Sequence, residues 1–313
     1  MQLSAVGDHL PHRPVLYNEI LHALQPHRAG IYIDCTVGAG GHAWGILSAS
    51  EPDGCLLGLD VDPQALQLAG ERLAAYGMRV KLVRASFTTL RQQVELRGWG
   101  KVDGILLDLG ASSMQFDTQE RGFSFLVNAP LDMRFDPANP VMASDLVNDL
   151  SEAELADVLF HFGEERSSYR VARAIVNARP ILTTQQLAEV VARVTVSGRM
   201  GMHPATRTFQ ALRISVNKEL EALETVLPQA IDLLVPGGSL AVIAFHSLED
   251  RIVKQFFHRE SRDCLCPPKQ PVCTCKHQAS IKELFRRPAR PTENEVRENP
   301  RARSARLRVA IHL

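Results

Sequence analysis

The sequence predicts a Rossmann-like α/β fold with an inserted, mainly helical domain. Short apolar runs alternate with helical patterns from residue 14 to residue 108, which is typical of a parallel sheet with helices on both faces. A glycine-rich loop follows the first apolar run, and strand patterns return after residue 232, beyond a long helical stretch. One α/β domain with a helical insertion accounts for all three observations.

The first part of the chain supplies the repeating units of the sheet. Residues 14–25 have an amphipathic pattern, with Pro14 suited to the first turn of a helix. Four apolar runs are expected as strands, of which the second ends at Asp60 and the fourth at Asp108. Helices are expected after the glycine loop and from about Pro63.

The alternation breaks in the middle of the chain. Residues 116–135 have no regular pattern, and residues 144–225 have an almost wholly helical one, in which Ser151 and Glu154 fit a capping box. From residue 233 onward, a strand, a helix and a final strand close the chain.

This change of pattern predicts the domain boundaries. Residues 1–115 and 215–313 are expected to form the Rossmann-like domain. Residues 116–214 are expected to form the inserted helical domain, with a role in recognising the substrate.

Positive charge is concentrated in two stretches, although the whole chain has no net charge. Residues 251–313 carry 15 Lys and Arg against 6 Asp and Glu, and residues 166–213 carry eight Arg and one acidic residue, Glu189. A guanidinium group bonds two phosphate oxygens at once. Solvated helix faces are the alternative for any single arginine, but the two stretches together favour a nucleic-acid partner.

The remaining composition indicates a soluble, cytoplasmic protein without a membrane partner. Hydrophobic residues make up 45% of the 313 residues, an ordinary fraction for a globular protein. The sequence shows neither a signal peptide nor an apolar window of about 18–20 residues.

The loop at residues 38–42, with His42 after three glycines, predicts a cofactor site. Backbone N–H groups of such a loop can approach a ligand, and the helix N-terminus that follows favours negative charge. Asp60 ends the next strand, where a carboxylate can bond both ribose hydroxyls of an adenosine. The combination fits two cofactors, NAD and S-adenosylmethionine.

Three features favour S-adenosylmethionine. Ala43 stands where a G-x-G-x-x-G motif beginning at Gly38 would have its third glycine. Asp108 and a polar cluster stand at the end of the fourth strand, facing the cofactor crevice. The tail from residue 234, with its Pro-Gly-Gly turn, resembles the terminal hairpin of class I S-adenosylmethionine-dependent methyltransferases, which implies a mixed seven-stranded sheet.

Longer segments carry a more specific resemblance. In chain order they are HRPVLYNE at 12–19, GIYIDCTVGAGGH at 30–42, DGILLDLGASSMQFD at 103–117, RGFSF and PLDMRFDP at 121–137, HPATRTFQALRISVN at 203–217, FHSLEDR at 245–251 and ENPRARSARLR at 298–308. With these segments the chain resembles the bacterial MraW or RsmH family, the ribosomal small-subunit RNA (cytosine-N4)-methyltransferases.

The resemblance implies a substrate and a set of cofactor contacts. The substrate is a cytosine in the decoding region of small-subunit (16S) ribosomal RNA, methylated at N4 within the assembling or assembled 30S subunit. The cofactor contacts, matched position by position, are Gly40, Gly41, His42, Asp60, Phe87, Asp108 and Gln115.

The acceptor site is less defined, because Asp108-Leu-Gly-Ala-Ser-Ser replaces the Asp/Asn/Ser-Pro-Pro-aromatic motif of many amino methyltransferases. We expect Asp108, Ser112 and Ser113 to flank the target base. The opposite wall is expected to comprise Asp132, Arg134, His246 and Ser247. Phe123, Phe125 and Phe135 are candidates for stacking on a splayed base, with core packing the commoner fate of a Phe.

Four of the six cysteines lie within twelve residues, at Cys264, Cys266, Cys273 and Cys275. A structural Cys₄ zinc site is one interpretation, although C-x-C is tighter than the usual C-x₂-C spacing. Unliganded thiols and disulfides are the alternatives, and a reducing cytoplasm disfavours disulfides. Cys35 and Cys55 are expected in the core.

Three other functions are compatible with parts of the pattern. The chain could methylate another nucleic acid, such as DNA or transfer RNA. It could instead be a non-catalytic RNA-binding ribosome-assembly factor, although the intact loop, Asp60 and Asp108 argue against this. An NAD dehydrogenase fits the sequence least well.

Overall fold

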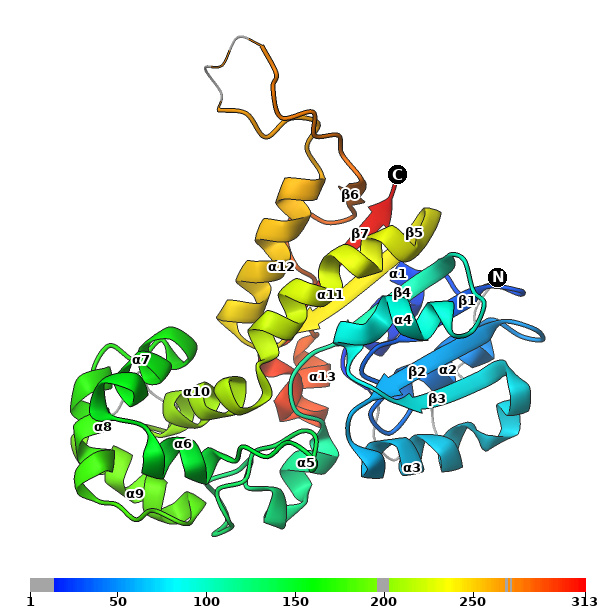
Figure 1. The fold of residues 1–313 in the computed structure, drawn as a ribbon. Coiled ribbons are helices and arrows are strands. Elements are labelled where there is room, and N and C mark those ends of the chain that lie inside the picture. The colour runs from blue at the N-terminus through cyan, green and yellow to red at the C-terminus, as the bar shows by residue number, and fades with distance from the viewer. Residues whose placement is uncertain (1–13, 196–202, 268–269, 271) are drawn as a thin grey trace. The chain divides into compact units, whose positions relative to one another are not determined.

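The computed structural model describes residues 14–195, 203–267, 270 and 272–313. The chain forms two compact units (Figure 1), a sheet unit of Met1–Gly110 with Ala222–Leu313 and a helical unit of Ala111–Glu221. Residues 111–115 and 215–221, predicted in the Rossmann-like domain, belong to the helical unit. For residues 215–217 the reason is that α10 (Thr206–Asn217) continues to Asn217 and packs on helices of that unit.

The sheet unit contains a mixed seven-stranded sheet, as predicted. The strand order is β3-β2-β1-β4-β5-β7-β6. Strands β1 to β5 are parallel, whereas β7 is antiparallel to both β5 and β6. The strands are β1 (Ile31–Asp34), β2 (Cys55–Asp60), β3 (Val80–Arg84), β4 (Val102–Asp108), β5 (Leu234–Ala244), β6 (Ile281–Glu283) and β7 (Arg306–His312).

Helices cover both faces of this sheet because successive strand residues point to opposite sides. In β4, Ile105 and Leu107 belong to one buried cluster and Leu106 to the other. The first cluster includes residues of α4 (Leu90–Glu95), α11 (Glu219–Leu233) and α12 (Ser247–Glu260). The second includes residues of α1 (Tyr17–Leu24), α2 (Gly41–Ala49) and α3 (Pro63–Leu73).

The helical unit has its own apolar core, formed by short helices. They are α5 (Ser113–Asp117), α6 (Ala143–Asp149), α7 (Glu152–Gly163), α8 (Ser168–Asn177), α9 (Thr184–Val194) and α10. Ser151 and Glu154 form the predicted capping box of α7. A Cβ atom on Gly163 would lie 2.7 Å from the carbonyl oxygen of Arg207, so the glycine allows α7 and α10 to pack closely.

Two local details differ from the expectation. Pro14 was expected in the first turn of a helix, but the first helix begins three residues later, at Tyr17. Leu16, just before it, has a left-handed backbone conformation. Strand β6 and the short helix α13 (Glu293–Glu298) were not located from the sequence. Among the described residues, no helix is long and apolar enough to cross a membrane.

Candidate active site

Three aspartates end neighbouring strands of the sheet unit. β1 ends at Asp34, β2 at Asp60 and β4 at Asp108. Strand β1 lies between the other two, with Asp34 in register with Gly58 and Leu106. Ligands of open α/β sheets bind outside the carboxyl ends of the strands, so this edge is the candidate site. Sequence reasoning missed Asp34, although it ends an apolar run just as the other two do.

The glycine loop between β1 and α2 has a conformation that glycine favours. Gly38 and Gly40 have φ angles of 50° and 79°. A Cβ atom on Gly40 would lie 3.3 Å from the Cα of Ala69, and one on Gly41 would lie 2.5 Å from Cγ of Pro14. Helix α2 begins at Gly41 without a side-chain cap. Its first backbone N–H groups can therefore donate to a negatively charged part of a ligand.

Asp60 connects this loop to the end of β2. Its Oδ2 accepts a hydrogen bond from the N–H of Gly38 at 2.9 Å, and its Oδ1 accepts one from the N–H of Asp62 at 2.9 Å. Each carboxylate oxygen has a further lone pair for a ligand hydroxyl. The Ala85 N–H donates to the carbonyl of Asp60, and Phe87 follows Ala85 by two residues, so Phe87 lies near the end of β2. The contacts of Asp60 and Phe87 with a cofactor stay predictions.

Asp108 faces His42 across the candidate site. His42 Nε2 lies 3.7 Å from Asp108 Oδ2, and the His42 ring stacks on Tyr17. The Asp108 N–H donates to Oγ1 of Thr36 at 2.7 Å. Asp108 Oδ1 is buried and has no hydrogen-bond partner among the described residues. A buried polar atom without a partner fits a site that a polar ligand completes.

Burial governs the protonation of this edge. It raises the pKa of Asp108 to about 8, with the charges of Asp34 and Glu249 adding to the effect. It also raises the pKa of Asp34 to about 7 and that of Asp60 to about 6. Burial lowers the pKa of His42 to about 4, so this ring is neutral at pH 7. Closely spaced carboxyl groups with raised pKa values favour a positively charged ligand, which stabilises their ionised forms.

Ser112 and Gln115 form the start of α5 in the helical unit. The Gln115 N–H donates to Ser112 Oγ at 3.3 Å, and the Ser112 N–H donates to Gln115 Oε1 at 3.0 Å, which makes a capping box. Gln115 is buried. Ser112, Ser113, Gln115 and Asp132 lie in the helical unit, and Asp108 and His246 lie in the sheet unit. Their grouping around one base stays a prediction.

Asp132 and Arg134 form a two-pronged ion pair within the helical unit. Arg134 Nε and Nη2 each lie 2.8 Å from one carboxylate oxygen of Asp132. Asn217 holds the same loop by accepting from the Phe135 N–H at 2.7 Å and donating to the Met133 carbonyl at 2.8 Å. Burial opposes ionisation of Asp132, but the hydrogen bonds and charge of Arg134 outweigh it and lower its pKa. A carboxylate held in this way accepts a proton poorly.

The three candidate stacking phenylalanines pack within the helical unit. Phe123 is buried and stacks on Phe135, with ring centroids 5.6 Å apart. Phe125 stacks on His203 at 4.5 Å and meets Phe209 edge-on. This packing favours a place in the apolar core, and not stacking on a base, for Phe123.

His246 caps α12, directly after β5. Its Nδ1 accepts from the Glu249 N–H at 3.4 Å, and its Nε2 lies 3.1 Å from Glu249 Oε1. Glu249 Oε2 in turn accepts the N–H groups of Phe245 and His246. Since Ile243 of β5 is in register with Asp108, this cap lies near the candidate site. Glu249 was missed at the sequence level, although H-x-x-E is a capping-box spacing.

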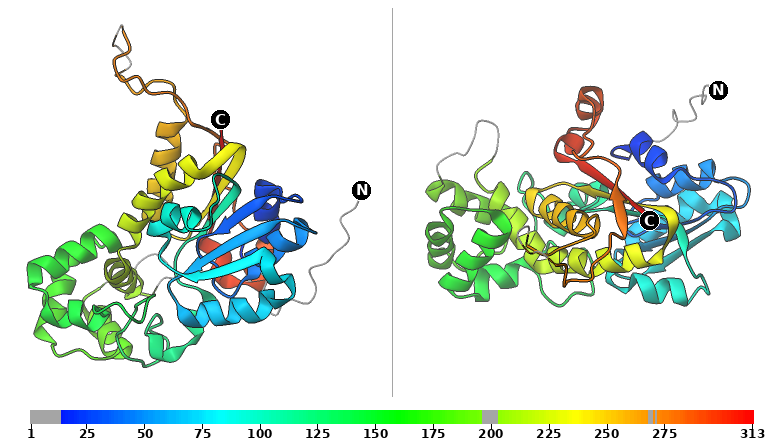
Figure 2. Two further views of the ribbon diagram at one scale, coloured as in Figure 1. Left: turned by 45° about the vertical axis from the view of Figure 1, so that its right-hand side comes forward. Right: turned by 90° about the horizontal axis from the view of Figure 1, so that it is seen from above.

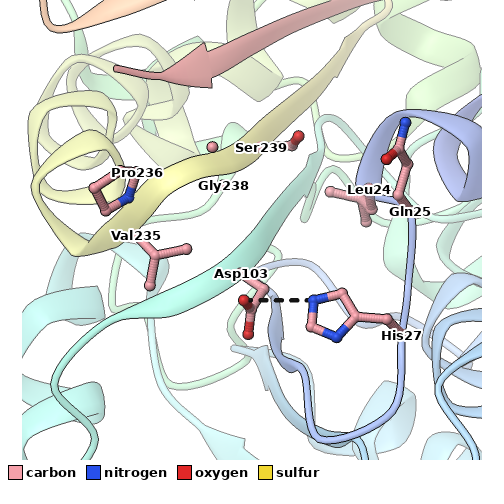
Figure 3. Close-up of a pocket in the computed structure, with 9 residues that line it drawn as sticks. Leu24, Gln25, His27, Asp103, Val235, Pro236, Gly238 and Ser239 are labelled. Atoms are coloured by element: carbon pink, nitrogen blue, oxygen red, sulfur yellow. Dashed lines mark ion pairs between the residues drawn. The ribbon is translucent and has the colours of Figure 1, made fainter.

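A separate pocket of about 230 Å³ lies at the opposite edge of the sheet (Figure 3). Asp103, at the start of β4, lines it together with His27 and Ser239. His27 Nε2 lies 3.5 Å from Asp103 Oδ1, and Asp103 Oδ2 accepts the Ile31 N–H. None of the predicted site residues lines this pocket, so the carboxyl edge stays the candidate site.

The cysteine cluster lies outside this edge, between α12 and β6. The sulfur atoms of Cys264, Cys266, Cys273 and Cys275 all lie within 4.8 Å of one another. Cys35 is buried in the sheet unit and Cys55 is half-buried in β2. The clustered cysteines are therefore the group in the chain that could hold a metal ion by thiolate ligands alone.

Comparison with known proteins places the chain among methylases. Residues 9–313 match the model of the MraW methylase family. The chain belongs to this family. It is 52% identical over 307 residues to the ribosomal RNA small subunit methyltransferase H of Symbiobacterium thermophilum, covering 96% of each protein. It is 50% identical over 301 residues to the protein of the same name from Dehalococcoides mccartyi, covering 96% of this chain and 86% of the relative.

Family membership confirms the resemblance seen in the sequence, and it favours a methylase over a dehydrogenase. Among solved structures, a putative rRNA methylase from Clostridium thermocellum covers 97% of this chain, with 12% identity and a TM-score of 0.46. A similarity at this level carries no functional argument. The fold assignment comes from the strand order described above.

Gly40 provides a test of the glycine loop in this family member. Gly40→Ala should weaken binding of S-adenosylmethionine about tenfold, equivalent to about 1.4 kcal/mol, because the new methyl group presses on α3. The control is Gly98→Ala, which also has a positive φ, of 68°, but has open space around its Cβ position. Both substitutions should cost about 1–2 kcal/mol of stability. Calorimetric titration at matched folded fractions measures the affinity of each variant. Equal affinities of the two variants would contradict a role of the Gly40 loop in cofactor binding.

Proposed function

We propose that this protein transfers a methyl group from S-adenosylmethionine to N4 of a cytosine in the decoding region of small-subunit ribosomal RNA. The observation that carries the proposal is the family match over residues 9–313. The relatives that cover almost the whole chain carry the name ribosomal RNA small subunit methyltransferase H.

The carboxyl edge of the sheet unit fits this cofactor. The N-terminus of α2 would receive its carboxylate, and Asp60 would bond its ribose hydroxyls. When bound, S-adenosylmethionine supplies an electrophilic methyl group on a positively charged sulfur. Asp34 and Asp108 suit that charge, because the pKa values of both are raised by burial and would fall beside a cation. The anionic diphosphate of NAD would meet these carboxyl groups unfavourably.

Asp108 is the best candidate to receive the proton that the exocyclic amine releases. Without a ligand its pKa of about 8 is the highest among the predicted carboxylates, and the cation of the cofactor would bring it closer to neutral. Asp132 is a weaker base because it is ion-paired with Arg134. Both ring nitrogens of His246 contact Glu249, one its carboxylate and the other its backbone N–H. We therefore assign proton acceptance to Asp108 and positioning roles to Asp132 and His246. A base near neutral pKa is the usual requirement for this step.

We further propose that the helical unit and the basic C-terminal stretch contact the RNA of the 30S subunit. Several arginines of both stretches have structural partners. Arg213 pairs with Glu219 at 2.8 Å, and Arg179 donates to the carbonyl of Val147 at 2.7 Å. Arg166, in the turn before α8, and Arg170, in the first turn of α8, are exposed and form no ion pair within the described residues. These two suit phosphate contacts best.

Replacing both Arg166 and Arg170 by Ala should weaken RNA binding and reduce its salt dependence. The slope of log K against log salt should become shallower by about 1.4, because each lost contact to single-stranded RNA removes about 0.7. Arg193→Ala is the matched control, because Glu189 lies 3.9 Å from its guanidinium. Filter binding over a salt series would refute the assignment if the control changed the slope as much as the double variant.

A methylation assay on different RNA substrates tests the proposed function. Small subunits from cells lacking this protein should accept one radiolabelled methyl group, which mass mapping should place on cytosine N4. Transfer RNA and duplex DNA should remain unlabelled. Labelling of DNA or transfer RNA alone would favour another nucleic-acid methyltransferase. Binding to subunits without cofactor binding or labelling would favour an assembly factor.

A further inference from the structure

Residues 261–280 connect α12 to β6, and the part of this segment that the structure describes extends away from the sheet in Figures 1 and 2. We call it the cysteine loop. Its described residues form neither helix nor strand, and Leu265 and Val272 are 39% and 70% exposed. Connections of this length without secondary structure are uncommon in compact proteins. The described residues of the loop belong to no apolar cluster, so the contacts that join its two arms are of another kind.

Conventional hydrogen bonds join the arms near the base of the loop. The Ser280 N–H donates to the Glu260 carbonyl at 2.9 Å, and His277 Nδ1 lies 2.8 Å from the Arg262 carbonyl oxygen. Further along, contacts to sulfur join them. The Leu265 N–H donates to Cys275 Sγ at 3.3 Å, and the Thr274 N–H donates to Cys266 Sγ at 3.4 Å.

The sulfur positions match those of ligands around one tetrahedral ion. Cys264 Sγ lies 3.5 Å from that of Cys273 and 3.8 Å from that of Cys275, and the last two are 3.6 Å apart. Zinc–sulfur bonds of about 2.3 Å in a tetrahedron place the sulfurs about 3.8 Å apart. A disulfide would instead bring two sulfurs to about 2.05 Å and leave the pairs separate.

We propose that Cys264, Cys266, Cys273 and Cys275 bind one zinc ion that clamps the two arms of the cysteine loop. All four ligands are protein thiolates, which is the composition of a closed structural site and not of a catalytic one. The N–H groups directed at sulfur would stabilise the negative charge of the thiolates. The binding free energy of the metal would take the place of the missing apolar core.

The site should affect the loop and leave the sheet unit intact. The clustered cysteines are exposed or half-exposed and are absent from both apolar clusters of the sheet unit. Loss of the metal should therefore free the loop without unfolding the sheet. Trypsin provides a readout, since Arg262 and Lys276 flank the cysteines.

Elemental analysis of the full chain, purified in metal-free buffer, tests the proposal. We expect about one zinc ion per chain, released by mercurial titration of the thiols. Exchange with cobalt(II) should give the absorption of a tetrahedral thiolate complex. Cys273→Ser/Cys275→Ser should lose the metal and gain rapid cleavage in the loop, with the main thermal transition unchanged. Cys55→Ser, which leaves the cluster intact, should keep the metal.

Three results would overturn the proposal. Wild-type protein could contain almost no metal and present four freely reactive thiols. It could be lighter by four hydrogens, which would show two disulfides. It could hold iron with a charge-transfer spectrum in place of zinc. Each is read on the wild-type chain, so the proposal stays testable even if the double variant does not fold.

Discussion

Replacing Asp108 by Asn should lower kcat by about 100- to 10,000-fold, the range that general acid–base catalysis contributes. Asn has the same shape and can accept a hydrogen bond from the amino group, but it cannot take up the proton. Binding of the cofactor should change much less, because Asp60 and the glycine loop remain. Single-turnover methylation of 30S subunits measures the first effect, and calorimetric titration measures the second.

The pH dependence of the wild-type protein provides a second readout of Asp108. Burial raises its pKa to about 8, and the carboxylate is the form that accepts a proton. The value of kcat/KM for S-adenosylmethionine should therefore rise with pH through about 8 and level off above it, since this ratio reports groups of the enzyme without the cofactor. The Asp108→Asn variant should lack this rise. A wild-type profile that is flat from pH 6 to 9 would remove Asp108 from the proton-accepting role.

Asp103→Asn is the matched control, because Asp103 lies at the other end of the same strand. It borders the pocket at the amino edge of the sheet, and Asn can still accept the Ile31 N–H. We expect nearly normal methylation from this variant. Equal losses in both variants would mean that the substitutions disturb β4 and do not report the site.

The sequence predicted those parts of the site that local pattern determines. Apolar runs ending in Asp60 and Asp108 placed both residues at the carboxyl edge, because parallel strands end on the same side. Asp34 has the same pattern and was overlooked. The capping role of His246 was also overlooked, although Glu249 stands three residues later at a capping-box spacing. Strand β6 has only three residues, too few for a recognisable alternation.

Counting charges also failed to separate binding arginines from structural ones. Arg306 and Arg308 contribute to the basic C-terminal stretch, but both face Asp250 of α12. Arg308 Nε lies 2.7 Å from Asp250 Oδ1, and Arg306 Nη1 lies 2.9 Å from Oδ2. A charge count cannot identify this pairing, because it connects residues more than fifty positions apart.

Asp250→Ala should destabilise the protein by about 3–5 kcal/mol, the usual cost of removing one partner of a buried ion pair. The side chain of Arg308 is only 7% exposed, so its charge would be left in the interior without a partner. Asp250→Ala/Arg308→Leu should recover much of the loss by removing that charge. The control is Asp232→Ala, whose ion pair with Arg91 is exposed and should contribute about 0–1 kcal/mol. Urea denaturation gives each free energy of unfolding.

The pH dependence of this difference tests its electrostatic origin. Burial opposes ionisation of Asp250, but hydrogen bonds from Arg308 and Arg306 outweigh it and lower its pKa. Such a group stabilises the fold above its unfolded pKa of about 3.9, and the stabilisation is lost as the pH falls through the lower pKa of the folded protein. The gap between wild type and Asp250→Ala should thus be constant from pH 5 to 8 and shrink in acid. A gap that persists unchanged at pH 3 would show that packing, and not charge, fixes β7 to α12.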